Sequence, residues 1–463
     1  MRSPHSTVLA LLLCGAGLPT LAFAQSGRDC NRSSFGLVPL PDLGGGTYRS
    51  VPGGLYPGGT NALPPAHLAA GLQHAAQVIP RNAAGQPDPA GRIALLSIGM
   101  SNTTQEFSTW RAWSELDPHR ARSVVVVDGA QGGQDARIIA DPNANFWTVV
   151  AQRLANAGVS DQQVQVIWLK EAMAAPSTTQ FPAHVVELQG FLEQIARNLH
   201  DKFPQARLCF LSSRSYGGYS THPQRTEPLS YETGFAVRGA IEAQIQGAPL
   251  LNHDPALGAV RSPWLAWGPY LWADGLNARS DGLLWRCEDY VTDGVHPSGS
   301  GRLQVADLLE AHWTTHPCAA SWYVGPQRPA RAGSLLYGNP CNGVAGEPRA
   351  QTNTPPTIGN ASFRLGLTNA APSAPAALFL ALDRARTPLA APCDLWLDTP
   401  FAALATTTAA NGAAQIAAPI PPDPLLEGLH VYDQWFVIDA TGTPIPGLGP
   451  LSATTGQLLQ LGL

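Results

Sequence analysis

Charge is scarce in this sequence of 463 residues. Asp, Glu, Lys and Arg make up 13% of it, the formal net charge is −5, and no block of basic residues occurs. Proteins that bind nucleic acid usually carry such a block, so we expect no nucleic-acid partner. Lysine occurs only at Lys170 and Lys202. We interpret the excess of arginine as codon bias rather than as an Arg-rich binding surface.

Long apolar runs are absent beyond the N-terminus, so we expect no membrane span. The first residues have the pattern of a secretory signal peptide, in which Arg2 precedes an apolar stretch and a small-x-small cleavage site ends at Ala24. This pattern predicts a signal peptide over residues 1–24 and a secreted protein. A lipid anchor on Cys14 is the alternative, but Leu13 is bulkier than the residue that usually precedes a lipoprotein cysteine.

Cysteine pairs with C-x-x-C spacing are also missing, which argues against zinc, and we expect neither a metal nor another cofactor. The cysteines that follow the signal peptide are Cys30, Cys209, Cys287, Cys318, Cys341 and Cys393. Six cysteines in a secreted chain fit up to three disulfides. Cys341 and Cys393 are the only two in the C-terminal part, so we expect them to pair. The pairing of the other four stays open, although Cys209 lies in an apolar strand pattern, which favours a free core thiol.

The length of the chain suits two domains. After an irregular lead-in, short apolar runs rich in β-branched residues occur at residues 93–98, 124–127, 164–169 and 208–211. Such runs are typical of fully buried parallel strands. Helical patterns separate or follow them, most clearly at residues 184–200 and again at about 300–313. The alternation predicts an α/β domain with a parallel sheet over residues 25–325.

The composition changes near residue 325. Gly, Pro and Arg are frequent in residues 326–340, which we interpret as a linker, and residues 341–463 contain many Ala, Thr and Pro. Short apolar stretches recur in this last segment between turn signals, which predicts an all-β sandwich rather than disorder. We expect few contacts to cross the linker. The second domain should then be dispensable for chemistry and serve binding, anchoring or secretion.

Ser101 is the first candidate for a reactive group. It follows the apolar run at residues 93–98 and Gly99, and active sites of parallel sheets lie beyond the carboxyl ends of the strands. A serine at the start of a helix can equally be an N-cap, and both interpretations stay open on this motif alone. Asn102, the next residue, is a candidate pocket residue.

Asp293 and His296 form the second candidate motif. Their three-residue spacing on one loop lets the carboxylate meet a ring nitrogen of the imidazole, fix its tautomer and stabilise its protonated form. Pro297 and Gly299 also suit a tight turn before a helix, so a purely structural turn explains this motif about as well.

Gly133 belongs to the third motif, a glycine-rich segment that follows the run at residues 124–127. A glycine after a strand can offer its backbone N–H to a developing oxyanion. A tight turn that needs a positive φ angle is the alternative. The segment lacks G-x-G-x-x-G spacing, so it is not a dinucleotide site.

Taken in chain order, these motifs resemble the SGNH, or GDSL-type, hydrolase superfamily over residues 91–313. That family has a nucleophilic serine in a G-D-S motif, an oxyanion glycine and a final D-x-x-H. Ser101, Gly133, Asp293 and His296 occupy these positions here, with Met100 in place of the acid. The resemblance implies a flavodoxin-like three-layer α/β/α fold, ester hydrolysis without a metal, and the N–H groups of Ser101 and Gly133 as the oxyanion hole.

The family's G-x-N-D block, whose Asn is a further oxyanion donor, has no match. The equivalent stretch ends in Lys170, Glu171 and Ala172. Lys170, paired with Glu171, is the candidate replacement. One such donor is typically worth about 3–4 kcal/mol of transition-state stabilisation. Its absence therefore favours a rival hypothesis to some degree, a catalytically silent protein that keeps the fold for carbohydrate recognition.

Other polar and aromatic groups are candidates for the pocket. Arg214 follows the run at residues 208–211, where it could bind an acidic or sugar-like substrate or hold a loop acid such as Glu227. Aromatic residues precede the Asp293 loop: Trp264, Trp267, Tyr270, Trp272 and Trp285. They suit either the core or a platform for sugar rings, and most aromatic residues belong to the core.

The C-terminal segment, residues 334–463, resembles the β-sandwich modules that end many large secreted bacterial proteins. Together these features predict a secreted serine esterase. Its substrate would be an acylated small molecule or polysaccharide, for example an acetylated carbohydrate, and the sequence does not indicate the oligomeric state.

Overall fold

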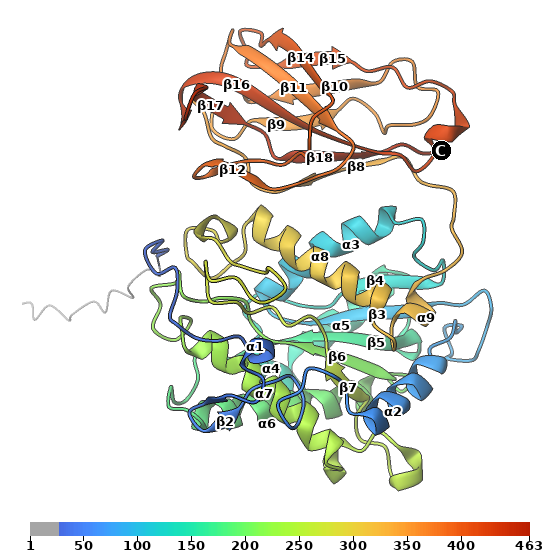
Figure 1. Cartoon of the computed structure of the whole chain (residues 1–463). Coiled ribbons are helices and arrows are strands. Elements are labelled where there is room, and N and C mark those ends of the chain that lie inside the picture. The colour runs from blue at the N-terminus through green and yellow to red at the C-terminus, as the bar shows by residue number, and fades with distance from the viewer. Residues whose placement is uncertain (1–26) are drawn as a thin grey trace, which may run out of the picture.

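The computed structural model describes residues 27–463, and the signal peptide predicted over residues 1–24 lies outside them. The chain forms an α/β domain and, above it in Figure 1, a β domain made of antiparallel strands. The predicted fold class, an α/β domain followed by an all-β sandwich, is confirmed. No helix among residues 27–463 is long and apolar enough to cross a membrane.

The α/β domain is built on a five-stranded parallel sheet. Its strands are β3 (Ile93–Gly99), β4 (Val124–Asp128), β5 (Val164–Lys170), β6 (Leu208–Ser212) and β7 (Trp264–Trp267), in the order β4-β3-β5-β6-β7. This is the flavodoxin-like order, in which the chain winds in opposite directions from the two central strands and opens a crevice at their carboxyl ends. Four strands match the predicted runs, and β7, an aromatic edge strand, was missed.

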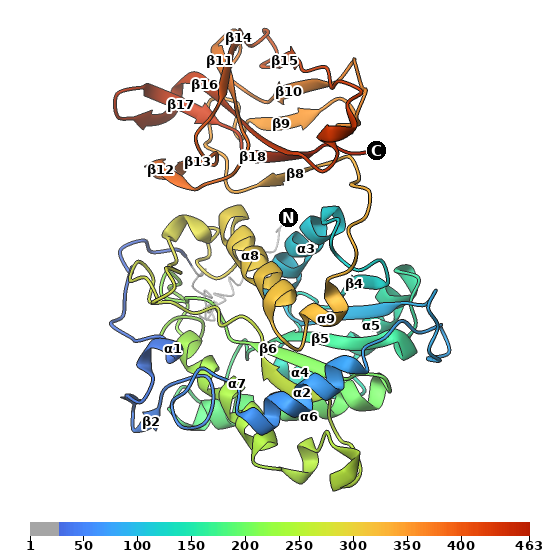
Figure 2. The same cartoon turned by 45° about the vertical axis from the view of Figure 1, so that its right-hand side comes forward.

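Helices cover both faces of this sheet. The helices of this domain are α1 (Leu40–Leu43), α2 (Pro65–Ala76), α3 (Ser101–Leu116), α4 (Ala136–Ala140), α5 (Asn145–Asn156), α6 (Ala183–Lys202), α7 (Leu229–Ile245), α8 (Gly299–Thr315) and α9 (Ala320–Tyr323). A short hairpin of β1 (Thr47–Tyr48) and β2 (Val51–Pro52) lies in the lead-in. Helices α3 and α8 pack together on the face toward the β domain, and α6 and α7 pack together on the opposite face (Figures 1 and 2). The apolar stripe predicted for α6 is buried throughout.

The β domain has two main sheets. The larger contains β14 (Ala402–Thr407), β11 (Pro375–Ala381), β16 (His430–Ile445), β18 (Gly456–Gln460) and β8 (Gly333–Tyr337), with β17 (Gly449–Ala453) paired to β16. The smaller contains β15 (Ala414–Ala417), β10 (Arg364–Thr368) and β9 (Arg349–Thr352), and β12 (Thr387–Ala390) pairs with β13 (Cys393–Leu395). Trp435, Leu378 and Leu365 are among the residues buried in its core. Strand β8 lies within residues 326–340, which the sequence predicted as a linker, and its backbone pairs with that of β18 in an antiparallel ladder.

The boundary between the domains carries more contacts than the composition predicted. An apolar cluster joins Leu303 of α8 to Tyr337, Trp396 and Leu458 of the β domain, with Trp113 of α3 packed against it. Ion pairs also cross this boundary. The expectation that few contacts would cross it is therefore wrong, because an apolar face of the α3–α8 helix pair is covered by the β domain rather than by solvent.

Among residues 27–463 the cysteines form one disulfide in each domain. Cys341 pairs with Cys393 inside the β domain, and Cys30 pairs with Cys287. Cys209 and Cys318 are free and buried. The Cys30–Cys287 bridge ties the lead-in to the segment just before the Asp293 loop. Two disulfides are compatible with a secreted protein.

Candidate active site

Ser101 lies at the carboxyl end of β3, where the strand turns directly into helix α3. Gly99 makes this turn possible, since a Cβ there would lie 2.3 Å from the Lys170 carbonyl oxygen and 2.4 Å from Thr103 Oγ1. Met100 is the N-cap residue of α3, and its side chain makes no cap hydrogen bond. The N-cap interpretation of Ser101 is therefore wrong: Ser101 is the first residue of the helix, and its hydroxyl contacts His296.

Ser101, His296 and Asp293 form a continuous hydrogen-bonded chain. His296 Nε2 lies 2.8 Å from Ser101 Oγ, and His296 Nδ1 lies 2.5 Å from Asp293 Oδ2. A carboxylate has no proton to donate, so His296 Nδ1 must carry the proton of the neutral ring and donate it to Asp293. The other ring nitrogen, Nε2, is then unprotonated and accepts from the serine hydroxyl. The structure thus brings the three residues together in the order that a serine nucleophile requires.

The carboxylate of Asp293 is held in its charged form. Burial raises its pKa, but hydrogen bonds from the His296 side chain and from the backbone N–H groups of His296 and Val295 outweigh burial and lower the pKa to about 2. The two backbone bonds reach Asp293 Oδ1 at 3.0 and 2.8 Å. Both oxygens are therefore occupied, and the loop fixes the direction in which the acid meets the imidazole.

Gly133 lines the same cavity as Ser101 and His296 and belongs to the loop after β4. Its φ angle is +75°, as the sequence suggested for this glycine-rich turn. The loop is tied to the nucleophile turn by a 2.9 Å hydrogen bond from Gln131 N to Gly99 O, and Arg153 donates to the Ala130 carbonyl at 2.6 Å. Within residues 27–463 we find no acceptor for the N–H groups of Gly133 and Ser101. Both are thus available as oxyanion donors.

Lys170 does not replace the missing oxyanion donor in the way the sequence predicted. Its ammonium group lies 2.6 Å from Glu106 Oε1 of helix α3, and both side chains are buried, so its partner is Glu106 rather than Glu171. Glu171 accepts from Ala172 N, and its other oxygen is buried without a partner among the described residues. Burial raises the pKa of Glu171, which favours its neutral form.

A cavity of about 270 Å³ contains these groups. It is lined by Met100, Ser101, Asn102, Thr103, Gly133, Lys170, Glu171, Ala172, Met173, Ala174, Arg214, Arg225, Val295 and His296. All the candidate catalytic, oxyanion and pocket residues except Asp293 thus line one cavity, and Asp293 lies behind His296. Arg225 and Met173 were missed, because Arg225 belongs to no motif and Met173, although it follows the predicted strand at residues 164–169, has an apolar side chain that does not mark it as a site residue.

The cavity has two guanidinium groups with no acceptor of their own. No hydrogen bond or ion pair joins the side chain of Arg214 or Arg225 to any residue in the range 27–463, and Arg225 Nε is buried without a partner. Glu227, the alternative partner of Arg214, instead accepts from Gly217 N, Tyr231 N and Trp272 Nε1.

The aromatic residues before the Asp293 loop belong to the core. Trp264, Trp272 and Trp285 are fully buried, and Trp267 and Tyr270 are at most 5% exposed. None of the five lines the cavity. The hypothesis of an aromatic platform for sugar rings is therefore wrong. Among residues 27–463 no group of three or more His, Cys, Asp or Glu side chains could hold a metal ion.

Comparisons with known proteins find only weak similarity. No protein-family profile and no curated protein matches the chain, so the SGNH resemblance stays a prediction. A carbohydrate acetylesterase from Xanthomonas citri is 11% identical with a TM-score of 0.25, over 79% of this chain and 78% of its own. A gut microbial diltiazem-metabolizing enzyme is 11% identical with a TM-score of 0.27, over 62% of this chain and 58% of its own.

A protein from Arabidopsis thaliana is also 11% identical, with a TM-score of 0.24 over 45% of this chain and 67% of its own. The similar solved structures thus include an esterase and other enzymes. At these identities and TM-scores they do not identify the reaction of this chain.

Proposed function

We propose that this protein is a serine ester hydrolase of the SGNH type. The observation that carries the proposal is the chain of hydrogen bonds from Asp293 through His296 to Ser101 Oγ, on the wall of a cavity that is also lined by Gly133, whose N–H group has no acceptor among residues 27–463. This combination matches what acyl transfer needs: a nucleophile, a base, a group that orients the base and an oxyanion hole.

The reaction proceeds in two halves. His296 Nε2 takes the proton of Ser101 Oγ as this oxygen attacks the ester carbonyl carbon, and the N–H groups of Ser101 and Gly133 stabilise the oxyanion. The intermediate collapses, the C–O bond to the alcohol breaks, and the imidazolium protonates the leaving oxygen. Water then attacks the acyl-enzyme with His296 again as base, and releases the acid and free Ser101.

The substrate is an acylated molecule that offers oxygen atoms or a negative charge to the cavity, such as an acetylated carbohydrate outside the cell. The guanidinium groups of Arg214 and Arg225, which have no side-chain partner among residues 27–463, support this choice, because a cation left without an acceptor in a cavity gains most from an anionic or strongly polar ligand. The apparent secretion signal and the two disulfides support an extracytoplasmic site of action.

The experiment that tests the proposal is labelling with a serine-directed fluorophosphonate, together with a screen of small esters. We expect the wild type to be labelled and to hydrolyse at least one ester, and Ser101→Ala to lose both with an unchanged Tm. Ser108→Ala, on the same helix but bonded to Asp128, is the control and should still be labelled. A wild type that is folded, unlabelled and inactive would contradict the proposal.

A silent carbohydrate-binding protein is the second candidate. The ion pair of Lys170 with Glu106 supports it, since Lys170, the candidate replacement for the family's third oxyanion donor, is already bound to Glu106. The same experiment separates the two functions. A binding protein would retain acetylated sugars without cleaving them and would not react with the probe.

A further inference from the structure

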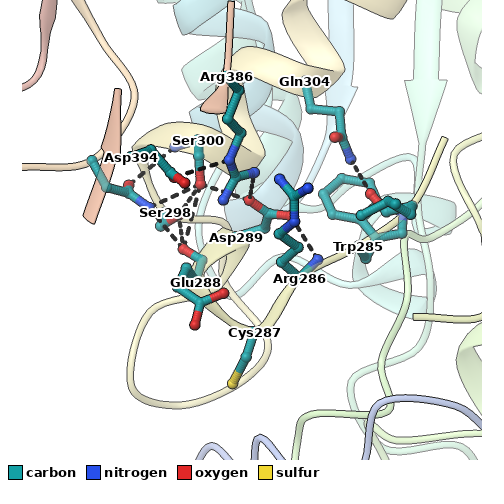
Figure 3. Close-up of polar contacts among 12 residues, drawn as sticks. Trp285, Arg286, Cys287, Glu288, Asp289, Ser298, Ser300, Gln304, Arg386 and Asp394 are labelled. Carbon is teal, nitrogen blue, oxygen red and sulfur yellow. Dashed lines mark hydrogen bonds and ion pairs between the residues drawn. The ribbon is translucent and has the colours of Figure 1, made fainter. Parts of the chain in front are cut away.

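Arg386 reaches from the β domain into the α/β domain. It lies just before β12, and its guanidinium contacts two acids, Asp289 Oδ1 at 2.5 Å and Asp394 Oδ2 at 2.9 Å (Figure 3). Asp394 belongs to β13 of the same domain, whereas Asp289 precedes the loop that carries Asp293 and His296. The side chain of Asp289 is fully buried, and that of Arg386 is 18% exposed. The pair therefore crosses the domain boundary away from bulk water.

Asp289 forms hydrogen bonds to residues before and after the loop that carries His296. Its Oδ2 accepts from Arg286 N at 2.7 Å, and its carbonyl oxygen accepts from Ser298 N at 2.8 Å. Its Oδ1, the atom that meets Arg386, also accepts from Ser300 Oγ at 2.7 Å. Ser298 and Ser300 lie two and four residues after His296, at the start of helix α8. A shift of Asp289 is therefore passed directly to the turn that sets the position of the imidazole.

Asn339 of the β domain makes a second connection to the same segment. Its side-chain amide donates to the Glu288 carbonyl at 2.8 Å and accepts from Ser300 N at 3.1 Å. Trp396 holds this residue in turn, because its indole N–H donates to the Asn339 carbonyl at 3.0 Å. Two side chains from the β domain thus bond to the peptide segments on either side of the catalytic loop.

Electrostatics make Arg386 the critical member of this network. Asp289 is buried, and Arg386 is the only cation that pairs with it among residues 27–463. Removing one partner of a buried ion pair leaves an uncompensated charge, which attracts water or moves toward solvent. Since Asp289 also bonds to the backbone and to Ser300, such a movement would displace both ends of the His296 loop.

We infer that Arg386 is a positioning residue for His296, and that the β domain thereby completes the active site of the α/β domain. This inference rests on the proposed esterase function. It replaces the expectation that the second domain is dispensable for chemistry. A displacement of a catalytic group by about 1 Å from its productive position can lower the rate by about a hundred-fold. We therefore expect the contact between Arg386 and Asp289 to affect turnover, although neither residue touches Ser101.

The test compares two arginines that both cross the domain boundary. Arg384 binds Asp307 in the middle of helix α8 and does not touch the His296 loop, so Arg384→Gln controls for the loss of a domain contact. The full-length variants are compared on one small neutral ester for kcat and KM, and with the fluorophosphonate for the rate of Ser101 labelling. Ser101→Ala is included in every assay.

We expect Arg386→Gln to lower kcat and the labelling rate by about ten-fold or more with little change in KM, and Arg384→Gln to stay within about two-fold of the wild type. Arg386→Lys, which keeps the charge but reaches fewer acceptors, should recover part of the loss. If Arg386→Gln does not fold, Asn339→Ala replaces it and should also lower kcat. Wild-type turnover in a folded Arg386→Gln, or equal losses in the Arg384 and Arg386 variants, would overturn the inference.

The outcomes also separate this inference from the proposed function. Hydrolysis by Ser101→Ala at the wild-type rate would refute the nucleophile, whatever Arg386 does. An active wild type and an inactive Ser101→Ala, combined with a fully active Arg386→Gln, would leave the esterase in place and remove only the role of the β domain.

Discussion

The side-chain amide of Asn102 donates a 2.8 Å hydrogen bond to the carbonyl oxygen of Val295. Asn102 follows Ser101 directly and Val295 precedes His296 directly, so this bond couples the turn that carries Ser101 to the loop that carries His296. Asn102 also lines the cavity, and its side-chain N–H group is already used in this hydrogen bond.

Asn102→Leu, which keeps the branched shape of the side chain but removes the donor, should lower kcat/KM by about ten-fold, mainly through kcat, because the distance from Ser101 to His296 becomes less well fixed. The measurement is steady-state hydrolysis of a neutral ester together with Tm. A rise in KM at constant kcat would instead mean that Asn102 contacts the substrate rather than positioning the loop.

The sequence predicted the elements that position the site better than the contacts inside it. Strands β3, β4, β5 and β6 are fully or almost fully buried, so their continuous apolar runs can be recognised in the sequence without knowledge of the segments that pack on them. Strand β7 was missed because two of its four residues are Trp, which are typical of both an edge strand and a binding platform. The order of Ser101, Asp293 and His296 along the chain was enough to predict that they meet.

Contacts between residues far apart in the chain could not be predicted. Lys170 is the last residue of β5, and its side chain could reach either a neighbour in the sequence or a helix packed on the sheet. Only the packing of α3 against the sheet places Glu106 Oε1 2.6 Å from Lys170 Nζ. Likewise, Arg386 and Asp289 are 97 residues apart and in different domains. Nothing in the composition of residues 326–340 indicates that the β domain returns to cover helices α3 and α8.

His316 should make the stability of the protein depend on pH. Burial lowers its pKa from 6.5 to about 4, and its Nδ1 accepts from Cys318 N at 3.2 Å. Between pH 6.5 and 4 the unfolded chain therefore binds more protons at this site than the folded one, so the contribution of His316 to stability is lost as the pH falls through this window. Each pKa unit corresponds to about 1.4 kcal/mol, which gives about 3 kcal/mol over the window.

His316→Asn tests this, since Asn keeps an acceptor near the position of Nδ1 but does not titrate. Urea unfolding of both proteins at pH 7.5 and 4.5, followed by tryptophan fluorescence, should show that the variant loses less stability on acidification than the wild type. Parallel losses in the two proteins would assign the acid sensitivity to other groups.

The Cys341–Cys393 disulfide should stabilise the β domain. It closes a loop of 52 residues, and a bridge of this kind typically contributes about 2–4 kcal/mol. The double variant Cys341→Ser/Cys393→Ser should therefore unfold at lower urea concentration, with the Cys30–Cys287 bridge unchanged as an internal control. Non-reducing peptide mapping checks the pairing directly. A peptide that joins either cysteine to Cys30 or Cys287 would contradict it.

Arg214 and Arg225 should make the proposed esterase prefer anionic substrates. Both line the cavity that contains Ser101 and His296, and neither guanidinium has an acceptor among residues 27–463. The acids nearby offset this charge only in part, because Glu106 is paired with Lys170, burial raises the pKa of Glu171, and burial raises the pKa of Glu227 to about 7, which favours the neutral forms of these two acids. A carboxylate on the substrate would supply the missing acceptor, and hydrogen bonds between charged groups contribute about 1.5–3 kcal/mol.

The direct measurement compares two acetylated sugars that differ only in charge, an acetylated methyl glucuronide and the corresponding glucoside. We expect kcat/KM to be about ten-fold or more higher for the glucuronide, and to fall toward that of the glucoside as salt is added, since screening weakens exposed charge pairs. Arg214→Gln and Arg225→Gln should each reduce the preference. Arg92→Gln removes the same charge from an exposed position and should leave it unchanged. Equal kcat/KM for the two sugars in the wild type would contradict the role of these arginines in binding an anionic substrate. Hydrolysis of both sugars would still agree with the proposed serine esterase.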